Sequence, residues 1–336
     1  MAIQERNDRF AEQGQPEWAH YCEKCIRFFG KRDGRPEFMV CAIVSDGITI
    51  GHPCCNVAHC MEPLPNKRSR FCVGHKYLNN KCSVEACSFP IAPDLLTCNN
   101  PEHISIFQDY EIRKSANFQQ KGQLSLEEEG SLAKSSAETC PQKSAAGNRP
   151  LRARFGCRQT HNEQLMVHPC GIIVAWATFF GSETVPQTVA MLKQVFREPG
   201  SMPEFFIYDN CCGVYNHLQA TNDPLLDAVG CPVNAFHFEC KHKASDIICR
   251  EHCNPSKFPE LINADGDWYF NSSKCEQLNS WLRGYQAILR EMNADRYDFL
   301  LDELIMHKNH ALVNDFMVLR GATGKRRQYQ TGFKVV

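Results

Sequence analysis

A doubled spacing of cysteines and histidines between residues 55 and 103 constrains this chain more than any other feature. Each copy offers three thiols and one imidazole, the ligand set of a closed tetrahedral zinc site. A segment of about twenty residues is too short to bury a core of its own, and a bound metal commonly replaces that core. The spacing therefore predicts two structural zinc sites. The two copies read Cys55-x4-Cys60-x11-Cys72-x2-His75 and Cys82-x4-Cys87-x10-Cys98-x4-His103.

The assignment of ligands within the repeats stays open at this level. Cys54 and His59 lie beside the ligands and could replace one of them. A cross-braced arrangement, in which each ion takes ligands from both copies, would use the same eight residues. The alternative to zinc is a set of buried or disulfide-bonded cysteines, which a ligand spacing repeated twice makes the weaker interpretation.

Composition limits where such a protein can act. Twenty cysteines in 336 residues would suit a secreted disulfide scaffold, but the N-terminal sequence MAIQERNDRFAEQGQ has no apolar core of a signal peptide. A reducing, intracellular compartment is therefore expected. No uninterrupted apolar run approaches the ~20 residues that a membrane span needs, so no membrane partner is expected. The net charge is −1, so any nucleic-acid surface must be local.

Two stretches of basic residues could form such a surface. No acidic residue lies between Glu62 and Glu85, and none lies from Thr139 through Asn162. Lysine and arginine side chains contact phosphates without reading base sequence, so DNA is the expected partner. The alternative is a solvent-exposed charged face without a binding partner, which is the usual role of a run of charged residues. The candidate residues are Lys67, Arg68, Arg70, Lys76, Lys81, Arg149, Arg152, Arg154 and Arg158.

Further cysteines and histidines outside the repeats are candidate metal ligands. Cys22-x2-Cys25 is a half-site that Cys41 and His52 or Cys54 could complete, with two structural thiols as the alternative. A second group lies late in the chain, where ordinary packing on a polar surface is the alternative to another zinc site. Its members are His237, His242, Cys249, His252 and Cys253.

The order of the expected elements indicates the fold. Residues 38–53 read as two strands separated at Asp46-Gly47, which is a hairpin signature. With the cysteine repeats removed, the order becomes βββαβαβα, that of an RNase H-like mixed sheet with flanking helices. The fold class is thus α/β, interrupted by a small cysteine-rich zinc-binding insertion. Strands are expected at 171–181, 205–212 and 233–240, and helices at 184–196, 212–220, 243–253, 272–292 and 296–313.

The same patterns predict the division of the chain. Residues 118–148 lack the apolar content that offsets chain entropy, so no stable structure is expected there. A short helix is expected at 106–120. The expected parts are a disordered N-terminus at 1–17, the first strands with the Cys22-x2-Cys25 half-site at 18–53, the tandem zinc cluster at 54–106, a flexible linker at 107–150, the rest of the RNase H-like core at 151–312 and a basic tail at 313–336.

Three acidic residues fall where nucleases and strand transferases of this fold carry their carboxylates. Asp46 lies on the first strand, Asp209 at the end of the fourth, and Glu276 on the last helix. Carboxylates from separate elements can hold two hard cations, Mg²⁺ or Mn²⁺, about 3.5–4 Å apart for phosphodiester chemistry. Each residue has an ordinary alternative: a hairpin turn for Asp46, a polar strand end for Asp209, and a capping box with Ser273 for Glu276.

The sequence also resembles a known family. VSDGITIGHPCC and the repeats that follow resemble the CxC-type zinc cluster associated with Kyakuja–Dileera–Zisupton (KDZ) transposases. RARFGCRQTHNEQL, CGIIVAWATFFGSE, FFIYDNCC, HFECKHKASDIICREHCNP and WYFNSSKCEQLNSWLRGYQAILREM resemble the transposase part. The resemblance covers about residue 18 to about residue 310, apart from the linker.

This resemblance implies a DDE-type, RNase H-like transposase of a DNA transposon, acting in the nucleus. It implies that Asp46, Asp209 and Glu276 are the triad that cuts and joins DNA, and that the zinc cluster aids binding of DNA or protein. No Asp lies near Cys170 and Gly171, so the triad would be broken if that strand were the first of the fold. The alternative is a truncated, inactive, transposase-derived module that binds zinc and a nucleic acid or a protein.

Overall fold

The computed structural model describes residues 2–16, 20, 22–30, 38–121, 151–242 and 245–323, with side chains except at 115–121 and 317–323. The chain forms two compact units. Unit 1 contains Met1–Cys54 and Gln159–Val336, and unit 2 contains Cys55–Arg158. The cysteine-rich segment is therefore an insertion into unit 1. None of the helices in the described ranges is long and apolar enough to cross a membrane.

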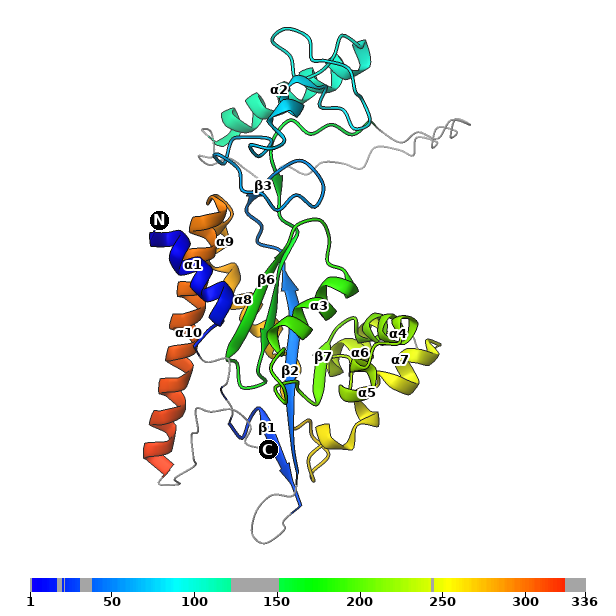
Figure 1. The fold of residues 1–336 in the computed structure, drawn as a ribbon, viewed down its shortest axis with the longest axis vertical. Helices are drawn as coiled ribbons and strands as arrows, with labels where there is room; N and C mark the ends of the chain where they lie inside the picture. Colours follow the sequence, from blue (N-terminus) through cyan, green and yellow to red (C-terminus); the bar gives the residue numbers. More distant parts are fainter. Residues whose placement is uncertain are drawn as a thin grey trace, which may run out of the picture. The chain divides into compact units, whose positions relative to one another are not determined.

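Unit 1 is built on a mixed five-stranded sheet with one long central strand, β2 (Figure 1). This strand pairs antiparallel with β1 and β5 and parallel with β7, and β6 pairs antiparallel with β5. Val44 of β2 has Val167 as its partner on one side and Ile207 on the other. The strands are β1 (Ile26–Phe29), β2 (Phe38–Ile48), β5 (Asn162–Val167), β6 (Ile173–Phe179) and β7 (Phe205–Tyr208).

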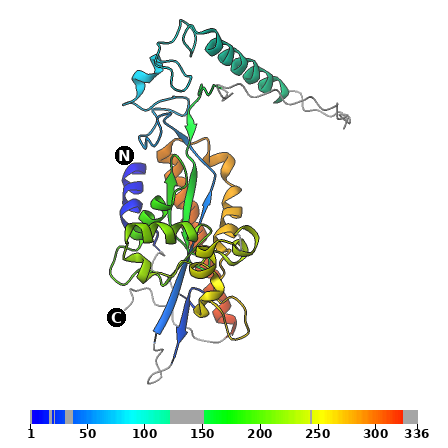
Figure 2. The ribbon, with the colours of Figure 1, turned by 90° about the vertical axis from the view of Figure 1, so that its right-hand side faces the viewer.

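Helices cover both faces of this sheet, which explains why its strands are apolar almost throughout (Figures 1 and 2). Successive residues of β2 point to opposite faces. Ile43 packs into one core with α3 and α4, whereas Ala42 and Val44 pack into a second core with α8, α9 and α10. These helices are α3 (Val185–Val195), α4 (Cys211–Thr221), α8 (Lys274–Arg283), α9 (Gln286–Leu289) and α10 (Ala294–Thr323).

Shorter elements connect these layers. His52 and Thr160 are joined by a backbone hydrogen bond of 3.0 Å, from the Thr160 N–H to the His52 carbonyl oxygen. This bond ties together the two points of unit 1 between which the insertion lies. The shorter elements are β3 (Pro53–Cys54), β4 (Arg158–Gln159), α5 (Leu225–Ala228), α6 (Ala235–Lys241), α7 (Ile247–His252) and two 3-10 helices, η2 (Pro255–Lys257) and η3 (Pro259–Leu261).

The expectation of a disordered N-terminus is wrong, because residues 2–13 form helix α1 (Ala2–Gln13) on the side of α10. Arg6 forms an ion pair with Glu303, lies 3.5 Å from the carboxylate of Asp302, and stacks on the ring of Phe299 at 4.6 Å. The polar composition of α1 suggested fraying. Its polar side chains find their partners on a helix near the other end of the chain, which local sequence does not reveal.

The predicted hairpin at residues 38–53 is also wrong. β2 runs through Asp46 and Gly47 as one strand, and Gly47 pairs with Gln164 of β5. A Cβ atom on residue 47 would lie 2.3 Å from Nδ2 of Asn162 and 2.9 Å from a carboxylate oxygen of Glu183. Glycine at position 47 therefore allows the side chains of Asn162 and Glu183 to lie close to the β2 backbone, and it does not form a turn. The second strand of the fold is β5, so the insertion lies between the first and second strands of the expected order.

One further strand prediction and the tail prediction need correction. Residues 233–240, expected to be a strand, contain helix α6, which begins where the Asn234 side chain accepts a hydrogen bond from the Phe236 N–H. Helix α10 continues to Thr323, so the expected basic tail begins inside a helix, and residues 324–336 lie outside the described part. The other expected helices are confirmed, with 272–292 divided into α8 and α9.

Within residues 55–121 and 151–158, the described part of unit 2, the helices are the 3-10 helix η1 (Lys76–Asn80) and the longer helix α2 (Pro101–Lys121). The predicted helix at 106–120 is confirmed, so the expected linker begins inside a helix. Residues 118–121, expected to lack stable structure, are its last turn, and residues 122–148 lie outside the described part. The apolar core of this unit is small: Val84 packs with the ligand cysteines Cys82 and Cys98. Such a unit needs a further stabilising element, which fits the expectation of bound metal.

Candidate metal centres

The first cysteine repeat forms one compact group in unit 2. Nδ1 of His75 lies 3.2 Å from Sγ of Cys72, 3.5 Å from Sγ of Cys60 and 3.6 Å from Sγ of Cys55. The Sγ atoms of Cys60 and Cys72 are 3.8 Å apart. Sulfur and nitrogen ligands at zinc-bond lengths define a tetrahedron with edges of about 3.3–3.8 Å. The four ligand atoms therefore match the outline of a zinc site.

The second repeat forms a separate group of the same kind. Nδ1 of His103 lies 3.3 Å from Sγ of Cys98 and 3.5 Å from Sγ of Cys82, and the Sγ atoms of Cys87 and Cys98 are 3.9 Å apart. The backbone N–H of Asn100 is the main cause that lowers the pKa of Cys98 to about 7, which favours the thiolate that binds metal. Each group takes all its ligands from one repeat, so the cross-braced arrangement is wrong.

The two neighbours of the first repeat do not join its ligands. The four-residue group contains neither Cys54 nor His59. Cys54 ends the first segment of unit 1 in strand β3, and His59 adopts a left-handed backbone conformation with φ of 58° in a turn. The two clusters could each hold a zinc ion, with the eight residues of the doubled spacing as ligands.

Cys22 and Cys25 are brought together with partners other than the expected ones. Their group is completed by His20 and Cys170. Cys41 instead donates its backbone N–H to a carboxylate oxygen of Glu204, and the His52 ring packs on the Tyr297 ring at 4.6 Å. The Cys22-x2-Cys25 spacing indicated the half-site. It could not indicate the two partners, His20 just before it and Cys170 some 150 residues after it.

The expected late zinc group is divided in the structure: His242 and Cys249 form a possible metal-binding group with Cys212, without His237, His252 and Cys253. Nδ1 of His242 lies 3.1 Å from Sγ of Cys249 and 3.5 Å from Sγ of Cys212, and these two cysteines form a disulfide. Sequence reasoning missed Cys212. The remaining members of the expected group lie elsewhere: His252 stacks on Tyr215, Cys253 packs into the core beside α4, and His237 lies among acidic side chains.

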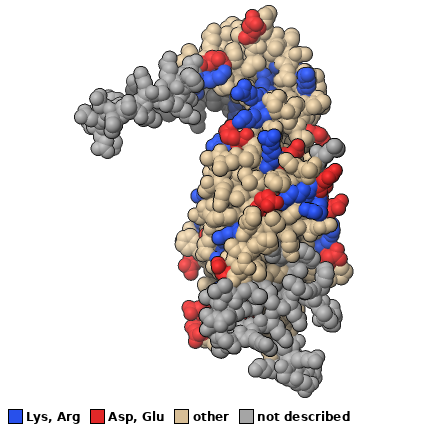
Figure 3. Space-filling model, turned by 90° about the vertical axis from the view of Figure 1, so that its left-hand side faces the viewer, with Lys and Arg blue, Asp and Glu red and all other residues tan. Residues whose placement is uncertain are grey.

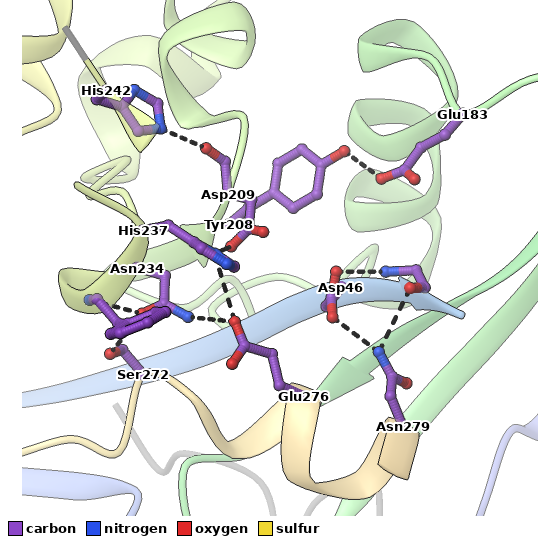
Figure 4. Close-up of polar contacts among 12 residues, drawn as sticks. Asp46, Glu183, Tyr208, Asp209, Asn234, His237, His242, Ser272, Glu276 and Asn279 are labelled. Carbon is purple, nitrogen blue, oxygen red and sulfur yellow. Dashed lines mark hydrogen bonds and ion pairs between the residues drawn. The ribbon is translucent and has the colours of Figure 1, made fainter. Parts of the chain in front are cut away.

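The three candidate catalytic carboxylates come from separate elements that meet at one end of β2 (Figure 4). Asp46 lies on β2, and Ser45 beside it pairs with Tyr208, the residue before Asp209. Glu276 lies in the first turn of α8, which packs against β2. The alternative explanations for Asp46 and Glu276 both fail. Asp46 is not at a hairpin tip, and the side chain of Ser273 makes no capping hydrogen bond.

A histidine links two of these carboxylates. Nδ1 of His237 contacts the carboxylate of Asp209 and lies 3.3 Å from Oε1 of Glu276. Asn234 Nδ2 donates to the same oxygen of Glu276 at 3.1 Å. The carboxylates are partly open to solvent, since the side chains of Asp209 and Glu276 are 28% and 33% exposed. Their ligand atoms and that of His237 lie within 4.8 Å of one another, close enough to share a cation.

Asp46 is held beside this group by two donors. Its carboxylate accepts the Gly47 N–H at 2.9 Å and Nδ2 of Asn279 at 2.7 Å. Burial, followed by the negative charge of Asp209, raises the pKa of Asp46 to about 7, and Glu276 and Glu183 contribute in the same direction. Such a shift marks a place where negative charge is concentrated and a cation would be favourable.

Besides Asn234, two residues of this site were not expected from sequence. Glu183 precedes α3, accepts a hydrogen bond from the Tyr208 hydroxyl, and lies 3.4 Å from Nδ2 of Asn162. Asn279 lies three residues after Glu276, so both side chains leave the same side of α8. That helical spacing was the one available signal for Asn279. Glu183 stands alone in the sequence and carried no signal.

The candidate DNA-binding residues of unit 2 differ in accessibility. Lys67, Arg68, Lys76, Lys81 and Arg152 are exposed. Arg154 is exposed but pairs with Glu85 at 3.3 Å, and Arg158 is half-buried.

Arg70 is not available as a surface cation, because it is 9% exposed, lies over the ring of Phe71, and has its pKa lowered by burial. Arg149 lies outside the described residues. Figure 3 shows basic and acidic side chains interspersed over one face of the molecule, in keeping with the near-zero net charge.

Comparison with known proteins agrees with the zinc interpretation of unit 2. The geometry defines two cysteine and histidine clusters that could bind zinc. Residues 44–110 match the family model of the CxC6-like cysteine cluster associated with KDZ transposases. The match covers about a fifth of the chain and suggests a transposase-related zinc-binding protein. No curated protein matches the chain. No solved structure matches it either.

Proposed function

We propose that this chain is a transposase-like protein that cuts and joins DNA, with unit 1 as the catalytic part and the zinc clusters of unit 2 as an aid to binding. The observation that carries the proposal is the grouping of Asp209 with Glu276, whose ligand atoms lie within 4.8 Å of each other, beside Asp46, whose pKa both of them raise. They come from a central strand, the end of its parallel neighbour and the first turn of a late helix. Nothing in the local sequence requires residues so far apart to converge, so a shared chemical role is the simplest reason.

The topology supports an RNase H-like assignment for unit 1. The strand order β6-β5-β2-β7 has three antiparallel strands followed by a parallel one, with α3 between β6 and β7. Gly230 continues the sheet beyond β7 as a parallel bridge to Phe205. The order is of the expected type, but β5 stands in place of the second hairpin strand and the Gly230 bridge stands in place of the strand expected at 233–240. On this assignment Asp46 lies on the first strand, so the absence of an Asp near Cys170 does not break the triad.

The donor set fits Mg²⁺ or Mn²⁺. Carboxylate oxygens are the ligands that these hard cations prefer. Burial is the main cause of the raised pKa of Asp46, and the negative charges of Asp209, Glu276 and Glu183 add to it, so a cation would be favourable there. Asp46, Asp209 and Glu276 would hold the ions, which would supply charge neutralisation at the attacking and leaving oxygens. His237 contacts Asp209 and lies 3.3 Å from Glu276, so the three side chains converge where a divalent cation would bind.

The reaction needs no further cofactor. In cleavage, water attacks a phosphodiester, the bond from phosphorus to the 3′ oxygen breaks, and a 3′ hydroxyl leaves. In joining, that hydroxyl attacks another phosphodiester, so one phosphorus–oxygen bond forms as one breaks. The residues of this chain would orient the phosphate and hold the carboxylates: Asn279 fixes the carboxylate of Asp46, and Asn234 fixes that of Glu276.

Unit 2 has side chains that suit a nucleic acid. Lys76 and Lys81 are exposed, and the exposed aromatic side chains Tyr77 and Phe89 adjoin them. The ammonium group of Lys81 lies 6.0 Å from the centre of the Tyr77 ring, and residue 89 is joined to Cys82 by a backbone hydrogen bond of 2.9 Å. Proteins that bind single-stranded nucleic acids use cationic side chains to contact the phosphates and aromatic side chains to stack on the bases. DNA as the partner makes the nucleus the proposed location.

The direct experiment is a nicking assay on supercoiled DNA with the full zinc-loaded chain. The proposal predicts nicking that needs added Mg²⁺ or Mn²⁺ and that falls by at least about 10²-fold in Asp209→Ala and Glu276→Gln. Asp298→Asn is the matched control, because Asp298 on α10 is also a carboxyl whose pKa burial raises to about 7, yet it lies in another cluster of acids. This control variant should nick normally.

The outcomes separate the two candidate functions. Nicking by the wild type that Asp209→Ala removes supports the enzyme. Salt-sensitive DNA binding without nicking, unchanged by Asp209→Ala and weakened by charge removal at Lys76 and Lys81, would replace it with an inactive binding module. Equal nicking by wild type and Asp209→Ala would indicate a contaminating nuclease and contradict the assignment of the triad.

A further inference from the structure

A four-residue group of metal-binding side chains lies inside unit 1, away from the carboxylates and outside the cysteine repeats. It consists of His20, Cys22, Cys25 and Cys170, whose ligand atoms all lie within 4.8 Å of one another. Cys25, Cys170 and His20 are buried, with exposed fractions of 0%, 4% and 8%, and Cys22 is half-buried. From this grouping we infer that unit 1 contains a structural zinc site with three thiolate ligands and one imidazole ligand.

The backbone around Cys22 and Cys25 has the form of a metal-binding turn. The N–H groups of Cys25 and Ile26 both donate to the carbonyl oxygen of Cys22, at 3.0 and 2.9 Å. The N–H of Cys22 lies 2.9 Å from Sγ of Cys25, and the two Sγ atoms are 3.6 Å apart. That separation agrees with the edge of about 3.8 Å expected for two thiolates on one zinc ion. The two sulfurs are therefore placed for a shared ion and are not bonded to each other.

The third thiol comes from another tight turn. Between β5 and β6, the N–H of Gly171 donates to the carbonyl oxygen of His168 at 2.8 Å, and the N–H of His168 donates to that of Ile172 at 2.8 Å. Gly171 has φ of 107°, which a residue with a side chain rarely adopts. This turn presents Cys170 inward to the Cys22 and Cys25 turn. Two thiol-bearing turns facing each other are a common way to build a closed zinc site.

The position of the group indicates what the ion would do. Along β2, Val44 pairs with Val167 at the end of β5, whereas Cys41 pairs with Ile26 at the start of β1. The group lies where β5 turns away and β1 begins, so an ion there would join the N-terminal segment to the β5–β6 turn. The site would fix the segment before β1 to the turn between β5 and β6, and both β1 and β5 pair with the strand that carries Asp46. It does not depend on the DNA-cleavage proposal.

Metal analysis of the full chain tests the inference. Cys22→Ala and Cys170→Ala should each bind one zinc ion fewer than the wild type, whereas Cys22→His should keep that ion because imidazole can replace a thiolate. Cys240→Ala is the control, because Cys240 is exposed and belongs to no group of metal-binding side chains in the described residues. It should leave the zinc content unchanged. Unchanged zinc in both Cys22→Ala and Cys170→Ala would overturn the inference.

A second measurement covers the case in which Cys170→Ala does not fold. The full chain refolded with Co²⁺ should show thiolate-to-cobalt absorption that decreases in Cys22→Ala and returns in Cys22→His. If Cys22→His loses as much of this absorption as Cys22→Ala, a tetrahedral site in which imidazole can replace the thiolate is contradicted. A disulfide between Cys22 and either other thiol, found by mass spectrometry in the freshly purified chain, would also contradict it.

Discussion

Replacing Asp46 by Asn removes a negative charge from the place where unit 1 concentrates carboxylates, and it should stabilise the protein without divalent cations. The pKa of Asp46 rises from an ordinary 3.8 to about 7 on folding. The folded state therefore keeps a proton that the unfolded chain releases, and the wild type loses stability as pH rises from about 4 to about 7. The variant has no such group, so its advantage should grow over the same window and then level off.

The expected size follows from the shift. Each pH unit inside the window changes the free energy of unfolding by about 1.4 kcal/mol, so about 2.7 kcal/mol is the upper limit for the growth in the variant's advantage between about pH 5 and about pH 8. The asparagine can be accommodated. Oδ1 of Asn279 is buried without a hydrogen-bond partner, so a flip of the Asn279 amide would let it accept from the new amide.

Urea unfolding followed by tryptophan fluorescence isolates the effect. All four tryptophans belong to unit 1, so the signal reports that unit and not the zinc clusters. The buffers should be freed of divalent ions by a resin, because a soluble chelator would also remove zinc. With Mg²⁺ or Mn²⁺ added, the sign should reverse at about pH 8, because ions that bind only the native state stabilise the wild type alone.

Two results would refute this reasoning. An Asp46→Asn advantage that is the same at about pH 5 and about pH 8 would show that Asp46 has an ordinary pKa in the folded protein. Equal stabilisation of wild type and variant by Mn²⁺ would show that Asp46 is not a ligand. Asp298→Asn is the control here too. It should show a similar pH dependence, since the pKa of Asp298 is also about 7, but it should keep the full stabilisation by Mn²⁺.

Three further predictions follow from packing and metal binding. Gly47→Ala should destabilise unit 1 by about 1–3 kcal/mol in urea unfolding, because its Cβ would meet Asn162; an unchanged midpoint would contradict the close approach. Arg6→Ala should cost about 1–3 kcal/mol in the same assay, because it leaves the buried carboxylate of Asp302 without its cation, and no change would mean that α1 is not docked. Cys82→Ala should remove one zinc ion by metal analysis while the tryptophan unfolding curve stays unchanged; a shifted curve would mean that the two units unfold together.

Sequence predicted the local parts of this structure well. Helices such as 184–196 and 296–313 follow from apolar residues at helical spacing, and each zinc group of unit 2 is encoded within some twenty residues. The errors arose where distant residues decide. Asp46-Gly47 has the sequence of a turn, but the glycine is there because Asn162 approaches it. Strand β5, which supplies that residue, was not expected from sequence.

The same distinction applies to the candidate sites. The acidic residues were found by matching element order to a fold. The structure groups Asp209 with Glu276 and leaves Asp46 beside that group, and their role as a triad stays a prediction. Glu183 and Cys170 were missed as site residues, because each joins its group through tertiary structure alone. Helix α1 was missed because its partners lie on α10. A single sequence carries no direct record of such pairings.

The most direct test of the central claim is a Mn²⁺ titration of the full zinc-loaded chain, read by electron paramagnetic resonance of the free ion. If Asp46, Asp209 and Glu276 form a divalent-cation site, the wild type should bind Mn²⁺ and Asp209→Ala should bind at least about tenfold more weakly. The zinc clusters should not compete, because thiolates suit Mn²⁺ poorly. No binding by the wild type, or equal binding by Asp209→Ala, would contradict the claim that these carboxylates form a metal-dependent catalytic site.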